Sequence, residues 1–288
     1  MKTTQPSETA VGSSTGAGAA SASRGGALRA AFDAAARDHR AVLVAYLTFG
    51  DPDPATSVEV LAACAEAGAG VIELGVPFSD PSADGPSIQR AMERALDAGG
   101  GLAGALDAVA ALRRRGITTP IVLFGYYNPI FVMGPEVFAA RAAAAGVDAV
   151  LTVDLPIDEL DELAAPLAAA GVAVVPLVAP TSTPDRIARL ARFAPPFVYY
   201  ISLTGVTGAR LAAPVDPARL AAIREASGAP VAVGFGIRTP ADARRFAAIA
   251  DGVVVGTALV DQVAAGAAAG APARVAALVG ELAGAMTR

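Results

Sequence analysis

Residues 42–76 read VLVAYLTFGDPDPATSVEVLAACAEAGAGVIELGV, and this stretch decides the fold. It begins with the apolar run Val42–Phe49, continues through an alanine-rich segment over about 54–68, and ends in a second apolar run, Val71–Val76. Continuous apolar runs, rather than runs that alternate with polar residues, are typical of parallel strands covered on both faces. The stretch therefore predicts a strand–helix–strand unit.

The same alternation continues to the end of the chain. Six further strands are expected at Pro120–Tyr127, Asp148–Asp154, Val172–Val178, Phe197–Leu203, Val231–Phe235 and Gly252–Val255. Helices are expected between the strands over about 54–68, 87–98, 102–115, 135–145, 158–170, 184–193, 217–227 and 240–249, with helical sequence after the last strand. Prolines that open helices (Pro54, Pro184, Pro217 and Pro240) and glycines that end them (Gly68, Gly116, Gly146, Gly171 and Gly228) support these boundaries.

Eight strand–helix units favour a closed barrel, because an open doubly wound sheet usually has about five or six strands. We therefore predict an α/β protein with one (β/α)8 TIM barrel over residues 27–288. An additional helix at Leu28–Asp38 precedes the first strand and is placed to close the bottom of the barrel. Residues 1–26 are small and polar and lack the apolar segment of a secretory signal, so we expect a disordered N-terminal tail.

The composition restricts both partners and chemistry. With 22 Lys and Arg against 27 Asp and Glu, the formal net charge is −5, and no nucleic-acid footprint is expected. No run approaches about 18 uninterrupted apolar residues, so no membrane span is expected. Cys64 and His39 are the only residues of their types, which argues against Ser-His-Asp catalysis and against a metal site. Cys64 is expected to be a buried apolar residue, and a single cysteine fits a cytoplasmic protein.

The end of the second strand and the loop after it carry the candidate catalytic acids. Glu73 is a single acid in an apolar strand, and if it points into the barrel its pKa is raised toward neutrality, which suits proton transfer. An exposed acid or a structural pair with an arginine is the alternative. The following loop, 77–86 (PFSDPSADGP), holds Asp80 and Asp84 between three prolines that restrict the backbone. Asp84 could instead cap the next helix, and the loop lacks the pattern of a calcium site.

Glycine-rich turns follow the sixth, seventh and eighth strands, at 205–208 (GVTG), 234–237 (GFGI) and 256–257 (GT). In barrels of this kind the loops after strands seven and eight commonly bind phosphate through backbone N–H groups and a helix N-terminus. The three turns therefore predict a phosphate site. No lysine accompanies them, so backbone donors would carry most of the binding, with Arg238 nearby.

Several motifs of the chain resemble those of a known family. The run 73–86 (ELGVPFSDPSADGP), followed by Ile88-Gln89, closely resembles the signature of tryptophan synthase α subunits. Similar motifs stand at 48–52 (TFGDP), 126–129 (YYNP), 154–156 (DLP), Ser202 with 205–208, and 234–237, and the similarity covers about residues 28–285. The resemblance implies a lyase that cleaves indole-3-glycerol phosphate to indole and glyceraldehyde 3-phosphate by a retro-aldol reaction.

The resemblance also implies roles for the two acids. Glu73 would be the principal acid and base, moving protons between indole C3 and a glycerol hydroxyl, while Asp84 would accept a hydrogen bond from the indole N–H. This agrees with the chemistry, because the indole carbanion is a poor leaving group until C3 is protonated and the resulting positive charge is offset. The implied substrate pocket consists of Tyr46, Thr48, Phe124, Tyr126, Tyr199 and Thr207, the last folding over the substrate to bond Asp84. The implied phosphate site consists of Gly208, Gly236, Gly256 and Thr257.

A partner is implied in the same way. A tryptophan synthase β subunit, which joins indole to serine with pyridoxal phosphate, would dock over the top of the barrel in an α2β2 heterotetramer and receive indole through a tunnel. The implied contact residues are Asp80, Asn128, Phe131, Asp154 and Pro156. The cofactor would belong to the β subunit, and none is expected in this chain.

Three residues depart from the common family pattern: Ser82 replaces an aliphatic residue, Tyr46 a frequent Phe, and Arg238 a small hydroxyl residue. They bear on substrate affinity and loop closure rather than on the reaction. Three alternatives stay open at the level of sequence: a stand-alone lyase that releases free indole, another phosphate-handling barrel such as a sugar-phosphate isomerase, and a non-catalytic regulatory subunit. The presence of both Glu73 and Asp84 argues against the last.

Overall fold

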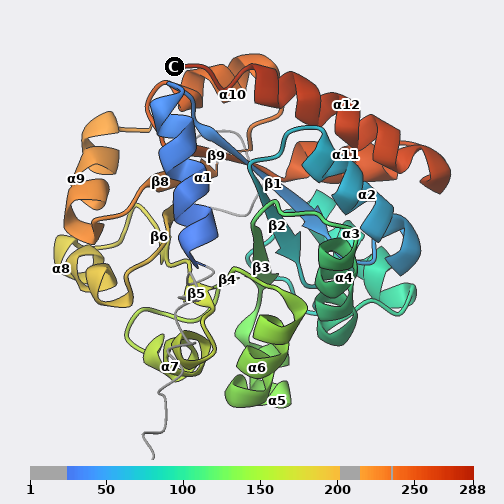
Figure 1. Ribbon diagram of the computed structural model, residues 1–288, viewed down its shortest axis with the longest axis horizontal. Helices are drawn as coiled ribbons and strands as arrows, with labels where there is room; N and C mark the ends of the chain where they lie inside the picture. The colour runs from blue at the N-terminus through green and yellow to red at the C-terminus, as the bar shows by residue number, and fades with distance from the viewer. Residues whose placement is uncertain (1–24, 202–214, 235) are drawn as a thin grey trace, which may run out of the picture.

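The computed structural model describes residues 25–201, 215–234 and 236–288, and it has the predicted TIM-barrel fold. Strands occupy the centre of the molecule and helices surround them (Figure 1). The strands are β1 Val42–Thr48, β2 Val71–Gly75, β3 Ile121–Gly125, β4 Ala149–Thr152, β5 Ala173–Val174, β6 Leu177–Val178, β7 Val198–Ile201, β8 Val231–Gly234 and β9 Gly252–Val255. All neighbouring strands are parallel, as the continuous apolar runs indicated.

The fifth predicted strand is divided into two pieces, and this division is where the barrel closes. The order in the sheet is β5-β4-β3-β2-β1-β9-β8-β7-β6, so its two ends belong to one short segment of chain. Between these ends, the Val175 N–H donates to the Val150 carbonyl at 2.9 Å, and the Pro176 carbonyl accepts from the Tyr199 N–H at 3.0 Å. The prediction of one continuous strand over 172–178 was wrong because Pro176 has no N–H to donate to a ladder.

The predicted glycine and proline signals lie where the boundaries are. Pro54, Pro184, Pro217 and Pro240 each stand in the first turn of a helix. The five predicted C-terminal glycines all have positive φ, between 67° and 105°. The helices are α1 Gly25–Arg37, α2 Pro54–Glu66, α3 Pro86–Asp97, α4 Leu102–Arg114, α5 Tyr127–Met133, α6 Pro135–Ala145, α7 Asp161–Ala169, α8 Pro184–Ala188, α9 Pro217–Ser227, α10 Pro240–Ala247, α11 Thr257–Ala264 and α12 Ala271–Gly284, with 3-10 turns at Arg189–Phe193 and Ala268–Gly270.

Helix α5 was not predicted, and its first residue, Tyr127, was wrongly assigned to the third strand. The strand ends at Gly125, and the next segment turns at once into a seven-residue helix. The N-terminus of α5 is capped from another loop, because the Tyr127 N–H donates to the Asp154 carboxylate at 2.8 Å. A cap supplied 27 residues away leaves no local signal in the sequence.

The apolar residues form two layers that are separated by the strands. Alternate residues of β1 belong to different layers: Val44 and Tyr46 face the barrel interior, whereas Ala45 and Leu47 pack against the surrounding helices. Glu73 pairs with Tyr46 in the register of β1 and β2, which brings its side chain into the interior layer. Each apolar strand therefore contributes side chains to two cores, and the interior core contains the candidate acid Glu73.

Helix α1 lies in front of the strands in Figure 1, within the outline of the ring that the other helices form. It begins at Gly25, so the last two residues of the predicted tail are helical, and residues 1–24 lie outside the described residues. Leu28 and Phe32 are buried against the interior layer, where the Phe32 ring stacks on Phe197 at 5.0 Å between centroids. This packing agrees with the expectation that the additional helix closes one end of the barrel.

Within the described ranges, no single helix is long and apolar enough to cross a membrane; only α3 and α4 taken together pass that test, and they meet at a 91° bend.

Candidate active site

Glu73 is buried inside the barrel. Among the described residues it is neither an exposed acid nor paired with an arginine, the two alternatives that the sequence left open. Its side chain comes from the middle of β2, is 1 % exposed, and its Oε1 atom has no hydrogen-bond partner in the described part of the chain. Burial, followed by the negative charge of Asp84, raises the pKa of Glu73 to about 8. The carboxyl group is therefore protonated at neutral pH, as a proton donor must be.

Asp84 is also buried, and it does not cap the next helix. Gly85 occupies the cap position of α3, and the Asp84 side chain turns instead toward Tyr126, whose O–H donates to Asp84 Oδ2 at 2.7 Å. The same hydroxyl oxygen accepts from the Ala83 N–H at 2.9 Å, so Tyr126 holds the loop at two adjacent points. Burial raises the pKa of Asp84 to about 6, against the lowering effect of the Tyr126 hydrogen bond.

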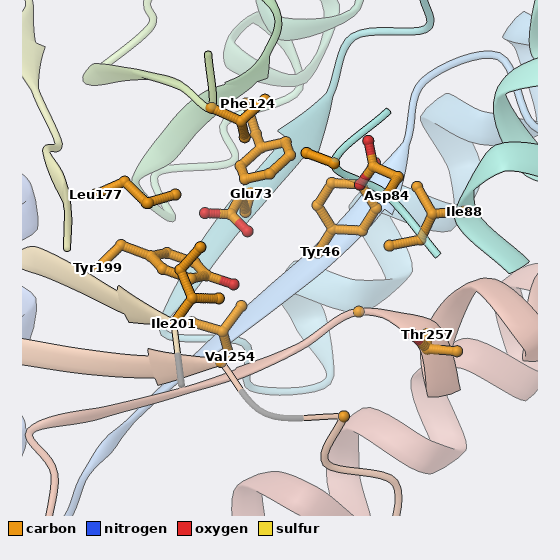
Figure 2. A pocket seen from close by; sticks show the side chains of 15 residues that line it. Tyr46, Glu73, Asp84, Ile88, Phe124, Leu177, Tyr199, Ile201, Val254 and Thr257 are labelled. Carbon is orange, nitrogen blue, oxygen red and sulfur yellow. The ribbon is translucent and has the colours of Figure 1, made fainter. Parts of the chain in front are cut away.

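The two acids line one pocket. It encloses about 850 Å³ of empty space including its open mouth. Figure 2 shows the Tyr46 ring between Glu73 and Asp84, and the charges of both acids raise the pKa of the Tyr46 phenol in addition to its burial. The lining residues are Tyr46, Glu73, Ala83, Asp84, Ile88, Phe124, Val153, Leu177, Tyr199, Ile201, Gly234, Gly236, Val254, Gly256 and Thr257.

Two glycines make room for the aromatic rings in this pocket. A Cβ atom at Gly75 would stand 2.3 Å from the Tyr46 hydroxyl oxygen, and one at Gly234 would stand 2.3 Å from that of Tyr199. Phe124 meets the Tyr46 ring edge to face, with centroids 5.3 Å apart. The pocket therefore has aromatic and apolar walls around two carboxyl groups, which suits a flat aromatic substrate that exchanges protons.

The predicted phosphate residues that are described lie at one end of the same pocket. Gly236, Gly256 and Thr257 all line it, and α11 begins at Thr257, so the N-terminus of this helix lies at that end. Gly236 adopts φ +58°, a left-handed conformation that favours glycine. Gly208 lies outside the described residues.

Arg238 is engaged elsewhere. It forms an exposed ion pair with Asp261 of α11 and does not line the pocket. Its guanidinium is therefore occupied in this structure, and the predicted reliance on backbone donors for an anion is in keeping with that arrangement.

Among the predicted substrate-pocket residues, three line the pocket and two stand behind it. Tyr46, Phe124 and Tyr199 form its wall, whereas Thr48 lies 3.4 Å from the Tyr46 hydroxyl and Tyr126 reaches the pocket only through Asp84. Thr207 lies outside the described residues.

Several apolar residues of the pocket wall were not predicted from the sequence: Ile88, Val153, Leu177, Ile201 and Val254. A signal for two of them was available, because Tyr199 faces inward and side chains on a strand alternate. Ile201 shares the face of Tyr199, and Leu177 pairs with Tyr199 in the register of β6 and β7.

The five predicted partner-contact residues lie around the same end of the barrel, and all are exposed: Asp80, Asn128, Phe131, Asp154 and Pro156. Phe131 is 60 % exposed and its neighbour Val132 is 77 % exposed, which is unusual for large apolar side chains. The bond from the Tyr127 N–H to Asp154 joins the helix that carries Asn128 and Phe131 to the loop that carries Pro156. Four of the five residues thus belong to one connected surface.

Comparison with known proteins adds an independent observation to this geometry. The family model described as "Tryptophan synthase alpha chain" matches residues 32–287. The chain belongs to the tryptophan synthase α-chain family.

Its similarity to named α chains is high over most of their length. It is 51% identical over 252 residues to the tryptophan synthase alpha chain of Burkholderia pseudomallei, covering 87% of this chain and 93% of that protein. It is 54% identical over 233 residues to that of Bordetella bronchiseptica, covering 80% and 82%. The structure of Mycobacterium tuberculosis tryptophan synthase matches with a TM-score of 0.83 and 39% identity, covering 91% of this chain and 98% of that one. As a member of this family, the protein is a lyase that cleaves indole-3-glycerol phosphate in tryptophan biosynthesis.

Proposed function

We propose that Glu73 and Asp84 together carry out the retro-aldol cleavage of indole-3-glycerol phosphate to indole and glyceraldehyde 3-phosphate. The protonated Glu73 gives its proton to indole C3, and the ring becomes an indolenine cation. The Asp84 carboxylate accepts the indole N–H and offsets the positive charge. The Glu73 carboxylate then removes the proton of the hydroxyl group on the carbon attached to C3. The C–C bond breaks, its electron pair returns to the indole ring, and the aldehyde forms.

The observation that carries this proposal is that the surroundings of the two acids give them different pKa values. Burial and the charge of Asp84 raise the pKa of Glu73 to about 8, whereas the Tyr126 hydrogen bond limits the rise at Asp84 to a pKa of about 6. Around neutral pH one acid is protonated and the other is ionised. Two carboxyl groups with different protonation states in one pocket are the usual arrangement for a proton donor beside a charge stabiliser.

The phosphate of the substrate would lie at the Gly236, Gly256 and Thr257 end of the pocket, together with Gly208. Its charge would be met by backbone N–H groups and the N-terminus of α11. Thr207 would approach Asp84 when substrate is bound.

We propose that the exposed surface around Phe131, with Asp80, Asn128, Asp154 and Pro156, binds a tryptophan synthase β subunit in an α2β2 complex. Indole would pass directly to that subunit, which would hold pyridoxal phosphate; this chain would bring no cofactor of its own. The exposed apolar side chains of α5 support the proposal, because they lose unfavourable contact with water on association. A single buried cysteine suits a cytoplasmic enzyme.

The test of the proposed roles is turnover of indole-3-glycerol phosphate by single variants. Glu73→Gln should lower indole release by at least about a thousandfold, because the amide is far too weak an acid to protonate indole C3, while glycerol 3-phosphate should bind as it does to wild type. Asp84→Asn should lower the rate by roughly a hundredfold or more. A Glu73→Gln enzyme with near-normal turnover would remove Glu73 from the mechanism. Measurement with and without a β subunit separates a channelling subunit from a stand-alone lyase.

A further inference from the structure

The motif at residues 48–52, TFGDP, contains a buried acid that lines no part of the active-site pocket. Asp51 is 3 % exposed, and it follows β1 directly at the end of the strand that carries Tyr46. A carboxylate is costly to bury without a partner, so its surroundings should show what it binds.

The partner of Asp51 is Arg94 in the third turn of α3. Arg94 Nε donates to Asp51 Oδ1 and Arg94 Nη2 donates to Asp51 Oδ2, both at 2.8 Å. This two-point contact fixes the direction of the guanidinium as well as its distance. The Asp51 side chain is 2 % exposed and that of Arg94 is 36 % exposed, so one half of the pair is shielded from water.

The backbone of the loop that carries Asp51 is also packed closely against α3. Gly50 adopts φ +85°, and a Cβ atom placed on it would stand 3.3 Å from Ala95 Cβ of α3 and 3.3 Å from the Gly100 Cα. The loop after β1 therefore lies directly against the C-terminal half of α3. The ion pair and this contact together fix the helix on the loop.

The other end of α3 holds the catalytic loop. The helix begins two residues after Asp84, and Gln89 Nε2 donates to the Asp84 carbonyl at 2.8 Å. Ile88, one turn into the helix, lines the pocket. Arg94 does not line the pocket, and its guanidinium is bound to Asp51, so it is not placed to contact the substrate.

We propose that the Asp51–Arg94 ion pair is a positioning device for the lyase reaction. It anchors α3 to the end of β1, and α3 in turn sets where Asp84 and Ile88 stand relative to Tyr46 and Glu73. This inference rests on the proposed role of Asp84. Neither member of the pair touches the reacting atoms, and both act through the helix.

The test compares a single variant, which removes one charge of the pair, with a double variant, which removes both. Arg94→Gln leaves the Asp51 carboxylate buried without its cation and should lower stability as well as activity. The double variant Asp51→Asn/Arg94→Gln removes both charges and should recover most of the lost stability. The matched control is Arg115→Gln, because Arg115 pairs with Glu59 at 2.7 Å and 2.9 Å but joins α2 to the end of α4 on the exposed surface.

The readout is kcat and KM for indole-3-glycerol phosphate, expressed per folded enzyme, together with the Kd for glycerol 3-phosphate. The double variant should lose at least tenfold in kcat while its KM and its Kd for glycerol 3-phosphate change less than about threefold, because the phosphate-binding turns lie on other strands. Arg115→Gln should keep the wild-type kcat.

A double variant that is folded and has the wild-type kcat would overturn the inference and leave the pair a stabilising contact only. An equal loss in Arg115→Gln would overturn it too, because any lost ion pair would then have the same effect. A wild-type enzyme that releases no indole would overturn the proposed function and this inference together.

Discussion

Tyr126→Phe is the substitution that most directly separates the two acids' roles. The Tyr126 hydroxyl donates to Asp84 Oδ2 at 2.7 Å and lowers the pKa of Asp84, which burial has raised to about 6. Phenylalanine keeps the ring and its stacking on Phe78, whose centroid lies 5.0 Å away, but it removes the donor. The pKa of Asp84 should therefore rise, and Asp84 should be ionised only at higher pH.

The size of the effect follows from the hydrogen bond. A bond to a charged group contributes about 1.5–3 kcal/mol, and about 1.4 kcal/mol corresponds to one pKa unit, so the acid limb should move up by about one to two pH units. It would then approach the basic limb, which Glu73 sets with a pKa of about 8. The fraction of enzyme with Glu73 protonated and Asp84 ionised falls about three- to 25-fold at pH 6.5, but only about 1.4- to 3.3-fold at the new optimum.

The assay is the pH profile of kcat/KM for indole release, which reports the free enzyme. The control is Tyr127→Phe, because Tyr127 is the adjacent residue and its hydroxyl donates to Glu162 at 2.7 Å, away from both acids. The Tyr127→Phe profile should coincide with that of wild type. A Tyr126→Phe profile that is scaled down without movement of its acid limb would refute this reasoning.

Three further outcomes are expected. Between pH 5 and 8, the free energy of unfolding of wild type should fall by up to about 1.4 kcal/mol per pH unit relative to that of Glu73→Gln. The reason is that the pKa of Glu73 is about 8 in the folded protein against 4.5 for an ordinary glutamate, so this group's contribution to stability is lost as the pH rises. Parallel curves of unfolding free energy against pH, measured by chemical denaturation, would contradict this. Gly75→Ala should lower kcat and thermal stability by displacing the Tyr46 ring, whereas Gly280→Ala, in α12 where a Cβ atom meets nothing within 4 Å, should lower neither. Cys64, which is fully buried with its pKa raised by burial to about 12, should react with a thiol reagent at pH 8 only as the protein unfolds, and rapid modification of the native enzyme would contradict its placement.

The parts of the fold that local chemistry determines were predictable from the sequence. Apolar runs located the strands, and residues such as Pro54 and Gly68 located helix boundaries, because each acts on the backbone at its own position. Helix α5 was missed because Asp154, which caps it, follows in another loop. The break at Pro176 was missed because an apolar run alone does not show which N–H groups a ladder needs.

The residues of the site likewise include some that the sequence identifies and others that only the folded structure shows. Glu73 and Asp84 stood out because a charged residue in an apolar strand or a proline-rich loop is conspicuous, and both indeed line one pocket. Val254 was not identified because an apolar residue in an apolar strand gives no sign of which layer it faces. The contact of Tyr126 with Asp84 depends on the neighbouring strand, and tertiary structure alone brings the two together.

The central claim is that Glu73 is a protonated acid at neutral pH inside the barrel. It can be measured directly by titrating the protein with 13C-labelled glutamate carboxyl groups, the Glu73 resonance being the one that is missing in Glu73→Gln. The expected midpoint lies near pH 8. A midpoint near the ordinary glutamate value of 4.5 would mean that the carboxyl is ionised when substrate arrives, and it would contradict the assignment of Glu73 as the proton donor.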